Sequence, residues 1–177
     1  MKILVATEKP FAKKAVDGIR QIVEGAGYEL ALLEKYTDKS ELLSAVADVD
    51  ALIIRSDKVT AEVIEAARNL KIVVRAGAGY DNVDLAAATA RGIVVMNTPG
   101  QNSNAVAELA LAMMIFMARN GFTPGTGSEI QGKTLGIHAY GNVGRLVGRK
   151  GKAMGMNVIA YDPFITDSAV FEADGVK

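Results

Sequence analysis

The sequence of 177 residues contains no cysteine, so disulfide bonds and thiolate metal sites are excluded. This absence fits a reducing compartment, and we expect a cytoplasmic protein. There is only one histidine, and no group of His, Asp and Glu residues has the spacing of metal ligands. The sequence therefore predicts no metal site.

An excess of charge and a long apolar run are also missing. Twenty basic residues balance twenty acidic ones, so nothing favours nucleic acid or an anionic membrane as a partner. The longest apolar run, Leu109–Ala118, is too short to span a bilayer. The apolar start, Met1–Ala6, is followed at once by Glu8, Lys9 and Pro10, which does not resemble a signal peptide. Half of the residues are apolar, as in globular domains.

Short apolar runs alternate with helical patterns over residues 1–97. The runs are rich in Val, Ile and Leu, which is typical of strands buried on both faces of a parallel sheet. The expected strands are Ile3–Ala6, Glu29–Leu33, Ala51–Ile54, Lys71–Val74 and Ile93–Met96. The expected helices are Phe11–Gly25, Lys39–Val46, Ala61–Ala67 and Asp84–Arg91, with Thr60 and Asp84 as the N-caps of the last two. This alternation predicts a doubly wound α/β domain.

A connecting helix is expected over residues 98–120. Turn residues at Thr98–Asn102 precede it, and the helix itself covers Asn104–Arg119 with Ser103 as its cap. Because this helix is apolar nearly all round, we expect it to be buried on every side, between domains or between subunits.

Residues 121–177 show a second and shorter α/β pattern. A glycine-rich loop, Gly121–Gly132, leads to a strand at Thr134–His138. A helix at Val143–Met154 and a strand at Asn157–Tyr161 follow. We therefore expect one βαβ unit, the beginning of an incomplete nucleotide-binding domain.

The turn between this strand and helix carries the sharpest motif. Gly141 can allow close approach of a diphosphate, Gly144 can allow close helix–strand packing, and the helix begins with free N–H groups. Asp162 ends the next strand, where a carboxylate can accept hydrogen bonds from the hydroxyls of the adenosine ribose. A carboxylate at this position repels a 2′-phosphate, so NAD is favoured over NADP. Ala139 replaces the first glycine of the fingerprint, and its strain depends on the sign of φ. The alternative is a turn that uses glycine only for packing.

Five segments resemble the D-2-hydroxyacid dehydrogenase family, and within it the phosphoglycerate dehydrogenases, in the same order along the chain. They are Arg55–Thr60, Val74–Asp84, Asn97–Ser103, Gly132–Ile137 and Tyr161–Pro163. The resemblance implies an α/β fold with a flavodoxin-like substrate domain, followed by the first βαβ half of a Rossmann NAD-binding domain. It also implies hydride transfer between a D-2-hydroxy acid and NAD, here the oxidation of 3-phosphoglycerate in serine biosynthesis.

The resemblance also assigns ligand positions. For the substrate, a phosphorylated hydroxy acid, the matching residues are Arg55, Arg75, Ala78, Gly79 and Asn102. For the dinucleotide they are Ala78, Asn142, Val143 and Asp162, and the motif adds Tyr140, Gly141 and Gly144. Both arginines follow strands, where guanidinium groups suit bidentate capture of anions. Alternatively, each arginine pairs with a local acid such as Asp57 or Asp81, and Gly77-Ala78-Gly79 is a simple turn.

No catalytic residue is expected in this chain. The resemblance implies that a histidine, a carboxylate and an arginine perform the chemistry in this family, and that all three come from later motifs. We expect His138 to be packed or bonded to backbone, and the chain to be an inactive fragment of a longer enzyme. Two alternatives are a non-catalytic NAD-sensing module and a dimerisation unit built on the Asn104–Arg119 helix. Under each of these hypotheses we expect a homodimer that forms through the region of this helix.

Overall fold

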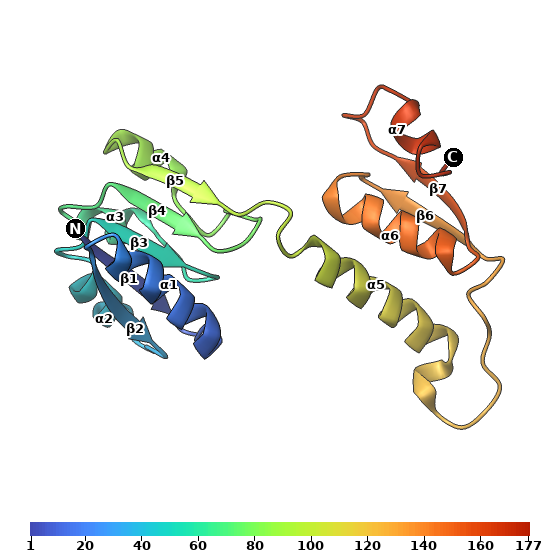
Figure 1. Ribbon diagram of the computed structural model, residues 1–177, viewed down its shortest axis with the longest axis horizontal. Coiled ribbons are helices and arrows are strands. Elements are labelled where there is room, and N and C mark those ends of the chain that lie inside the picture. The colour runs from blue at the N-terminus through green and yellow to red at the C-terminus, as the bar shows by residue number, and fades with distance from the viewer. The chain divides into compact units, whose positions relative to one another are not determined.

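The computed structural model describes residues 1–177, which divide into two compact units, Met1–Pro99 and Gly100–Lys177. Figure 1 shows the elements of each unit. The division lies close to the domain boundary predicted after residue 97. The helix predicted as a separate connection belongs to the second unit.

The first unit is built on a parallel sheet whose strands lie in the order β2-β1-β3-β4-β5. The strands are β1 (Lys2–Thr7), β2 (Glu29–Glu34), β3 (Ala51–Ile54), β4 (Ile72–Arg75) and β5 (Val94–Asn97). Every neighbouring pair is parallel. This is the flavodoxin-like order, as predicted. Each predicted strand end lies within one residue of the observed one.

Helices cover both faces of this sheet (Figure 1). The helices are α1 (Lys13–Gly25), α2 (Lys39–Ala45), α3 (Ala61–Ala66) and α4 (Leu85–Ala90). One face packs into a core with α2, α3 and α4, through residues such as Leu52, Ile64 and Val73. Helix α1 lies on the other face and buries Val16 and Val23. The central strands are buried from both sides, which explains their continuous apolar runs.

Two predicted N-caps have different outcomes. The Asp84 side chain accepts a hydrogen bond from the Ala87 N–H at 2.9 Å, as predicted for a cap of α4. Thr60 stands at the N-cap position of α3, but its side chain makes no cap bond and its hydroxyl is buried without a partner. A capping box at Asp38 and Glu41 begins α2, although sequence reasoning did not single it out.

The second unit consists of a long helix and one βαβ element. Its elements are α5 (Ser103–Ala118), the 3₁₀ turn η1 (Asn120–Phe122), β6 (Thr134–His138), α6 (Asn142–Ala153), β7 (Asn157–Tyr161) and α7 (Ala169–Glu172). Strands β6 and β7 pair in parallel, as the predicted first half of a Rossmann domain requires. Their core contains Tyr140, Met156, Val158 and Val176.

Helix α5 begins one residue earlier than predicted. Ser103 is its first residue and not its cap, and Asn102 at the N-cap position makes no side-chain cap bond. Only one stripe, at Ser103, Ala107 and Leu111, is buried, and the helix packs on α6. Within this chain the helix therefore buries one stripe, and the expectation that its other faces are covered between domains or between subunits stays a prediction. No helix of the structure combines the length and the apolar character needed to cross a membrane.

The two N-caps allow a matched test of this local chemistry. We expect Asp84→Ala to lower the free energy of unfolding by about 1 kcal/mol, because the Ala87 N–H loses its acceptor. Thr60→Val should be neutral or stabilising, because it removes a buried hydroxyl that has no partner. Urea unfolding measures both, and an equal loss in the two variants would contradict the assignment of the caps.

Candidate functional site

The turn between β6 and α6 is held tight by the absence of a side chain at Gly144. A Cβ atom there would lie 2.2 Å from the Ala139 carbonyl oxygen, so no other residue fits without a shift of the backbone. A Cβ atom on Gly141 would meet nothing within 4 Å. The turn is therefore closed toward the helix at Gly144 and open toward solvent at Gly141, as the dinucleotide motif requires.

The first turn of α6 has backbone donors without intrahelical partners. Gly141 is the N-cap and has no side chain to cap the helix, and the first helical bond runs from the Arg145 N–H to the Gly141 carbonyl. The N–H groups of Asn142, Val143 and Gly144 precede it and have no acceptor within the helix. Together with the helix dipole, these donors favour an anion at this point.

Asp162 lies at the same turn, as the sequence predicts. Its carboxylate accepts the Tyr140 N–H at 2.8 Å and the Phe164 N–H at 2.9 Å. The end of β7 is thereby tied to the turn that follows β6. The half-buried carboxylate has used one bond on each oxygen, so further lone pairs can accept donors from a ligand.

Tyr140 supports the turn from inside and offers little to a ligand. Its side chain is fully buried, its hydroxyl donates to Asp174 at 3.0 Å, and its ring centre lies 5.1 Å from that of Phe171 on α7. Burial, and then the hydrogen bond to Asp174, raise the pKa of Tyr140 to about 12. The Tyr140 N–H already bonds to Asp162, so it is not free for a dinucleotide. The only remaining support for Tyr140 as a dinucleotide residue is that it lies in the loop between β6 and α6.

Asp174 is a buried carboxylate that sequence reasoning did not find. Its oxygens accept hydrogen bonds from Arg149 Nε at 2.6 Å and from Arg145 Nε at 3.3 Å, in addition to the bond from the Tyr140 hydroxyl. Burial acts to raise the pKa of Asp174, but the bonds from Arg149, Tyr140 and Arg145 outweigh burial and lower it. The cluster joins α6 to the end of the chain, across a separation in sequence that no local motif reveals.

The two predicted substrate arginines lie at the carboxyl edge of the sheet in the first unit. Neither forms an ion pair, so the alternative that each pairs with Asp57 or Asp81 is wrong. Arg55 Nη1 donates to the Lys9 and Pro10 carbonyls, each at 3.2 Å. Arg75 Nε is buried without a partner. The positive charge of both guanidinium groups is thus not neutralised by a carboxylate.

Gly77 lies in the turn after β4, directly beside the side chain of Arg75. A Cβ atom on Gly77 would lie 1.4 Å from Arg75 Nη1. The glycine therefore makes room for the folded arginine. The loop is held by the Asn97 side chain, which donates to the Ala78 carbonyl at 2.7 Å, while Gly79 is exposed.

The remaining candidates are distributed between the two units. Four substrate positions lie in the first unit, while Asn102 belongs to the second and is exposed at the start of α5. Conversely, Ala78 lies in the first unit and the other dinucleotide positions lie in the second. No group of three or more His, Cys, Asp or Glu side chains is placed to hold a metal ion.

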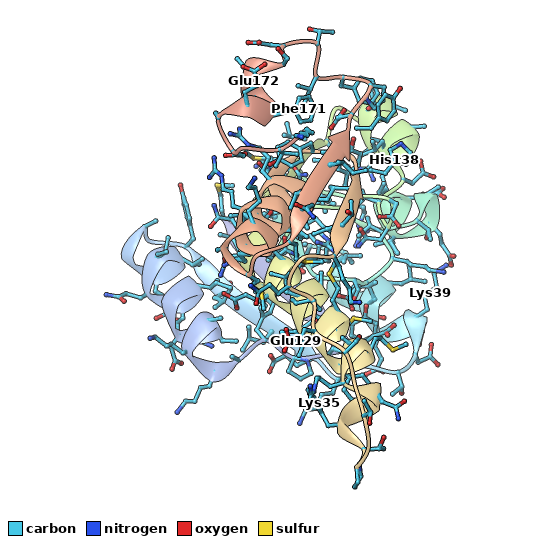
Figure 2. The ribbon with its side chains drawn as sticks, turned by 90° about the vertical axis from the view of Figure 1, so that its right-hand side faces the viewer. Lys35, Lys39, Glu129, His138, Phe171 and Glu172 are labelled. Atoms are coloured by element: carbon cyan, nitrogen blue, oxygen red, sulfur yellow. The ribbon has the colours of Figure 1, made fainter.

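His138 is exposed at the end of β6 (Figure 2). Its ring centre lies 5.7 Å from that of Tyr161, and it makes no hydrogen bond to the backbone. The imidazole ring of His138 therefore packs against the Tyr161 ring on one side and is open on the other. The histidine and Tyr161 line an open cavity of about 320 Å³ over β6 and β7.

The residue at the first glycine position of the motif is strained. Ala139 has a φ of 79°, in the left-handed region that residues with a Cβ atom adopt at a cost. We expect Ala139→Gly to raise the free energy of unfolding by about 0.5–1 kcal/mol, because relief of this strain exceeds the extra entropy of glycine in the unfolded chain.

The matched control is Ala173→Gly, where φ is −57° and glycine relieves nothing. This variant should lose stability. Thermal unfolding of both variants measures the difference, and a loss in Ala139→Gly equal to that of the control would contradict the strain.

Known proteins are similar to this chain over most or all of its length. The chain is 42% identical to the D-3-phosphoglycerate dehydrogenase of Archaeoglobus fulgidus, over 100% of this chain and 35% of that protein. It is 43% identical to the hydroxypyruvate reductase of Thermotoga maritima, over 76% of this chain and 49% of that protein. The chain therefore spans about half, or less, of the length of these relatives.

A solved structure agrees with the fold of both units taken in order. The NAD⁺-bound 3-phosphoglycerate dehydrogenase of Entamoeba histolytica matches 97% of this chain and 59% of its own chain, with a TM-score of 0.90 and 51% identity. The family model for the D-isomer specific 2-hydroxyacid dehydrogenase catalytic domain matches residues 4–173. This chain therefore belongs to the D-isomer specific 2-hydroxyacid dehydrogenase family.

Proposed function

We propose that this chain is part of an NAD-dependent oxidoreductase of D-2-hydroxy acids, which oxidises 3-phosphoglycerate to 3-phosphohydroxypyruvate in serine biosynthesis in the cytoplasm. The observation that carries the proposal is the contact of Asp162 with the turn that opens α6. This contact brings a carboxylate for a ribose beside backbone donors for a diphosphate.

The turn favours NAD over NADP. The free N–H groups of Asn142, Val143 and Gly144 suit the diphosphate, and Gly141 leaves the space in front of them open. Asp162 keeps lone pairs for the ribose hydroxyls, and its negative charge repels a 2′-phosphate. The NAD⁺-bound relative from Entamoeba histolytica supports this choice of cofactor.

The two arginines favour a substrate with two anionic groups. Arg55 and Arg75 both lie at strand ends of one sheet, and neither is neutralised by an acid. A phosphorylated hydroxy acid offers a carboxylate and a phosphate, whereas a plain hydroxy acid offers only one anion. We assign the backbone of Ala78 and Gly79 to the substrate carboxylate and Asn102 to the substrate side. Ala78 also serves the dinucleotide in this proposal.

Catalytic groups are not part of this proposal for the chain of 177 residues. Its only histidine, His138, is exposed against Tyr161 and has no acid that accepts a hydrogen bond from it. In catalytic sites, a basic histidine is itself oriented by a third group. We therefore expect the chain alone to bind ligands without turnover, so binding is the appropriate readout.

The cofactor assignment is tested by calorimetric titration with NAD and NADP. The chain should bind NAD more tightly than NADP, and Asp162→Asn should weaken NAD binding by about tenfold, since hydrogen bonds to a charged group are lost. Asp167→Asn is the matched control, because Asp167 also accepts a backbone N–H, at 2.9 Å, but lies outside the turn. Equal affinity for the two dinucleotides, or an equal effect in the control, would count against the proposal.

We further propose that the protein forms a homodimer through the region of α5. The large apolar residues that this region exposes are Val106, Leu109, Met113, Phe116, Met117 and Phe122. Such a contiguous apolar surface is typical of an interface between subunits.

Sedimentation velocity tests the dimer. The double variant Met113→Lys, Met117→Lys places two charges one helical turn apart on the exposed face and should yield monomers. Ile22→Lys is the control, because Ile22 is equally exposed but lies on α1. A dimer that survives the double variant would refute this interface.

A further inference from the structure

Asp57 is a buried carboxylate in the first unit that has no cationic partner. Only 4% of the residue is exposed, and it takes part in no ion pair. Its oxygens accept three donors: the Glu8 N–H at 2.7 Å, the Tyr36 hydroxyl at 2.9 Å and the Arg55 N–H at 3.3 Å. Burying a carboxylate costs free energy, so a set of donors that converges on it is a built feature of the fold.

The three donors come from the ends of three neighbouring strands. Glu8 follows β1, Tyr36 follows β2 and Arg55 follows β3. Burial, and then the bond to Asp57, raise the pKa of Tyr36, so the hydroxyl stays protonated and donates. Asn82 in the loop between β4 and α4 holds the same region, because its amide donates to the carbonyls of Arg55 and Asp57 at 3.2 and 2.7 Å.

Arg55 is held at its backbone and at its guanidinium, and both supports lead to Asp57. The backbone N–H bonds to Asp57 directly. The guanidinium bonds to two carbonyls of the loop 8–11 and lies over the Phe11 ring, with Cζ 5.3 Å from the ring centre. That loop is in turn anchored to Asp57 through the Glu8 N–H.

We propose that Asp57 is the positioning residue for Arg55, and that it fixes this guanidinium for the anionic group of the substrate through the backbone and the loop 8–11. The proposal rests on the function proposed above for Arg55. It adds a residue that does not touch the substrate, and it makes the loop after β1 part of the substrate site.

Positioning and charge predict opposite effects at this residue. The negative charge of Asp57 lies two positions from Arg55 and lowers the positive potential that attracts an anion. If charge alone mattered, neutralising Asp57 would tighten the binding of an anion. If positioning dominates, the same change weakens binding, because Arg55 loses part of its support.

Asp57→Asn separates the two effects with little change of shape. An asparagine can offer its oxygen to one side only, so its NH₂ group must face the N–H of either Arg55 or Glu8. Each of these bonds supports Arg55, so either orientation of the amide loosens the guanidinium. Asp57→Glu is the second variant, since it keeps the charge and displaces the carboxylate by one methylene.

The experiment is a calorimetric titration of the chain with 3-phosphoglycerate. Both variants should raise Kd by about tenfold or more, the effect of losing a hydrogen bond to a charged group. Asp50→Asn is the control: Asp50 also accepts a backbone N–H, from Lys2 at 2.8 Å, but it precedes β3 and lies at the opposite end of that strand. It should change Kd by less than about twofold, because a distant charge is screened. Unchanged or tighter binding in Asp57→Asn overturns the proposal.

A second measurement keeps the proposal separate from the function on which it rests. The Nε–Hε resonance of Arg55 in the NMR spectrum, assigned by its loss in Arg55→Gln, reports the order of the guanidinium without any ligand. It should be distinct in the parent chain and move to the averaged position of mobile arginines in Asp57→Asn, but not in Asp50→Asn. Absence of 3-phosphoglycerate binding in the parent chain would refute the substrate, whereas an unchanged Arg55 resonance would refute the positioning role.

Discussion

Parallel pairing of the strands is the constraint on which the rest of this structure depends. Every strand pair in both units is parallel, so each strand must be followed by a crossover before the next begins. All carboxyl ends of a sheet then lie at one edge, and the polar residues that follow the strands gather there. Arg55, Arg75 and the loop at Ala78 share such an edge in the first unit, and the glycine turn and Asp162 share one in the second.

Buried and half-buried carboxylates hold these loops in shape. Asp57 collects donors from the ends of β1, β2 and β3, and Asp162 ties the end of β7 to the turn after β6. Asp174 differs, because its donors are the side chains of Tyr140, Arg145 and Arg149. A carboxylate only accepts hydrogen bonds, so it can join several loops that each present an N–H or a hydroxyl. The loops at the strand ends are thereby ordered by these carboxylates.

Small residues complete the two edges for different reasons. Gly144 is required because the Ala139 carbonyl occupies the space that a side chain would need. Gly77 is required because the Arg75 guanidinium occupies the corresponding space. Ala139 lies at a position where glycine would be relaxed, and its positive φ places strain in the turn itself. Strain of this kind persists only where surrounding contacts determine the backbone, and the bonds at Tyr140 and Asp162 do so here.

The order and type of the elements follow from local sequence patterns, because burial on both faces of a parallel sheet leaves continuous apolar runs. The motif and the family resemblance also located the glycine turn, Asp162 and the two arginines. The folded chain was needed to show that Asp57 and Asp174 connect separate loops, that Gly77 makes room for Arg75, and that α5 buries one stripe within the chain. Hydrogen bonds and packing contacts of this kind join residues far apart in the sequence, and no local pattern records which donor a buried carboxylate will meet.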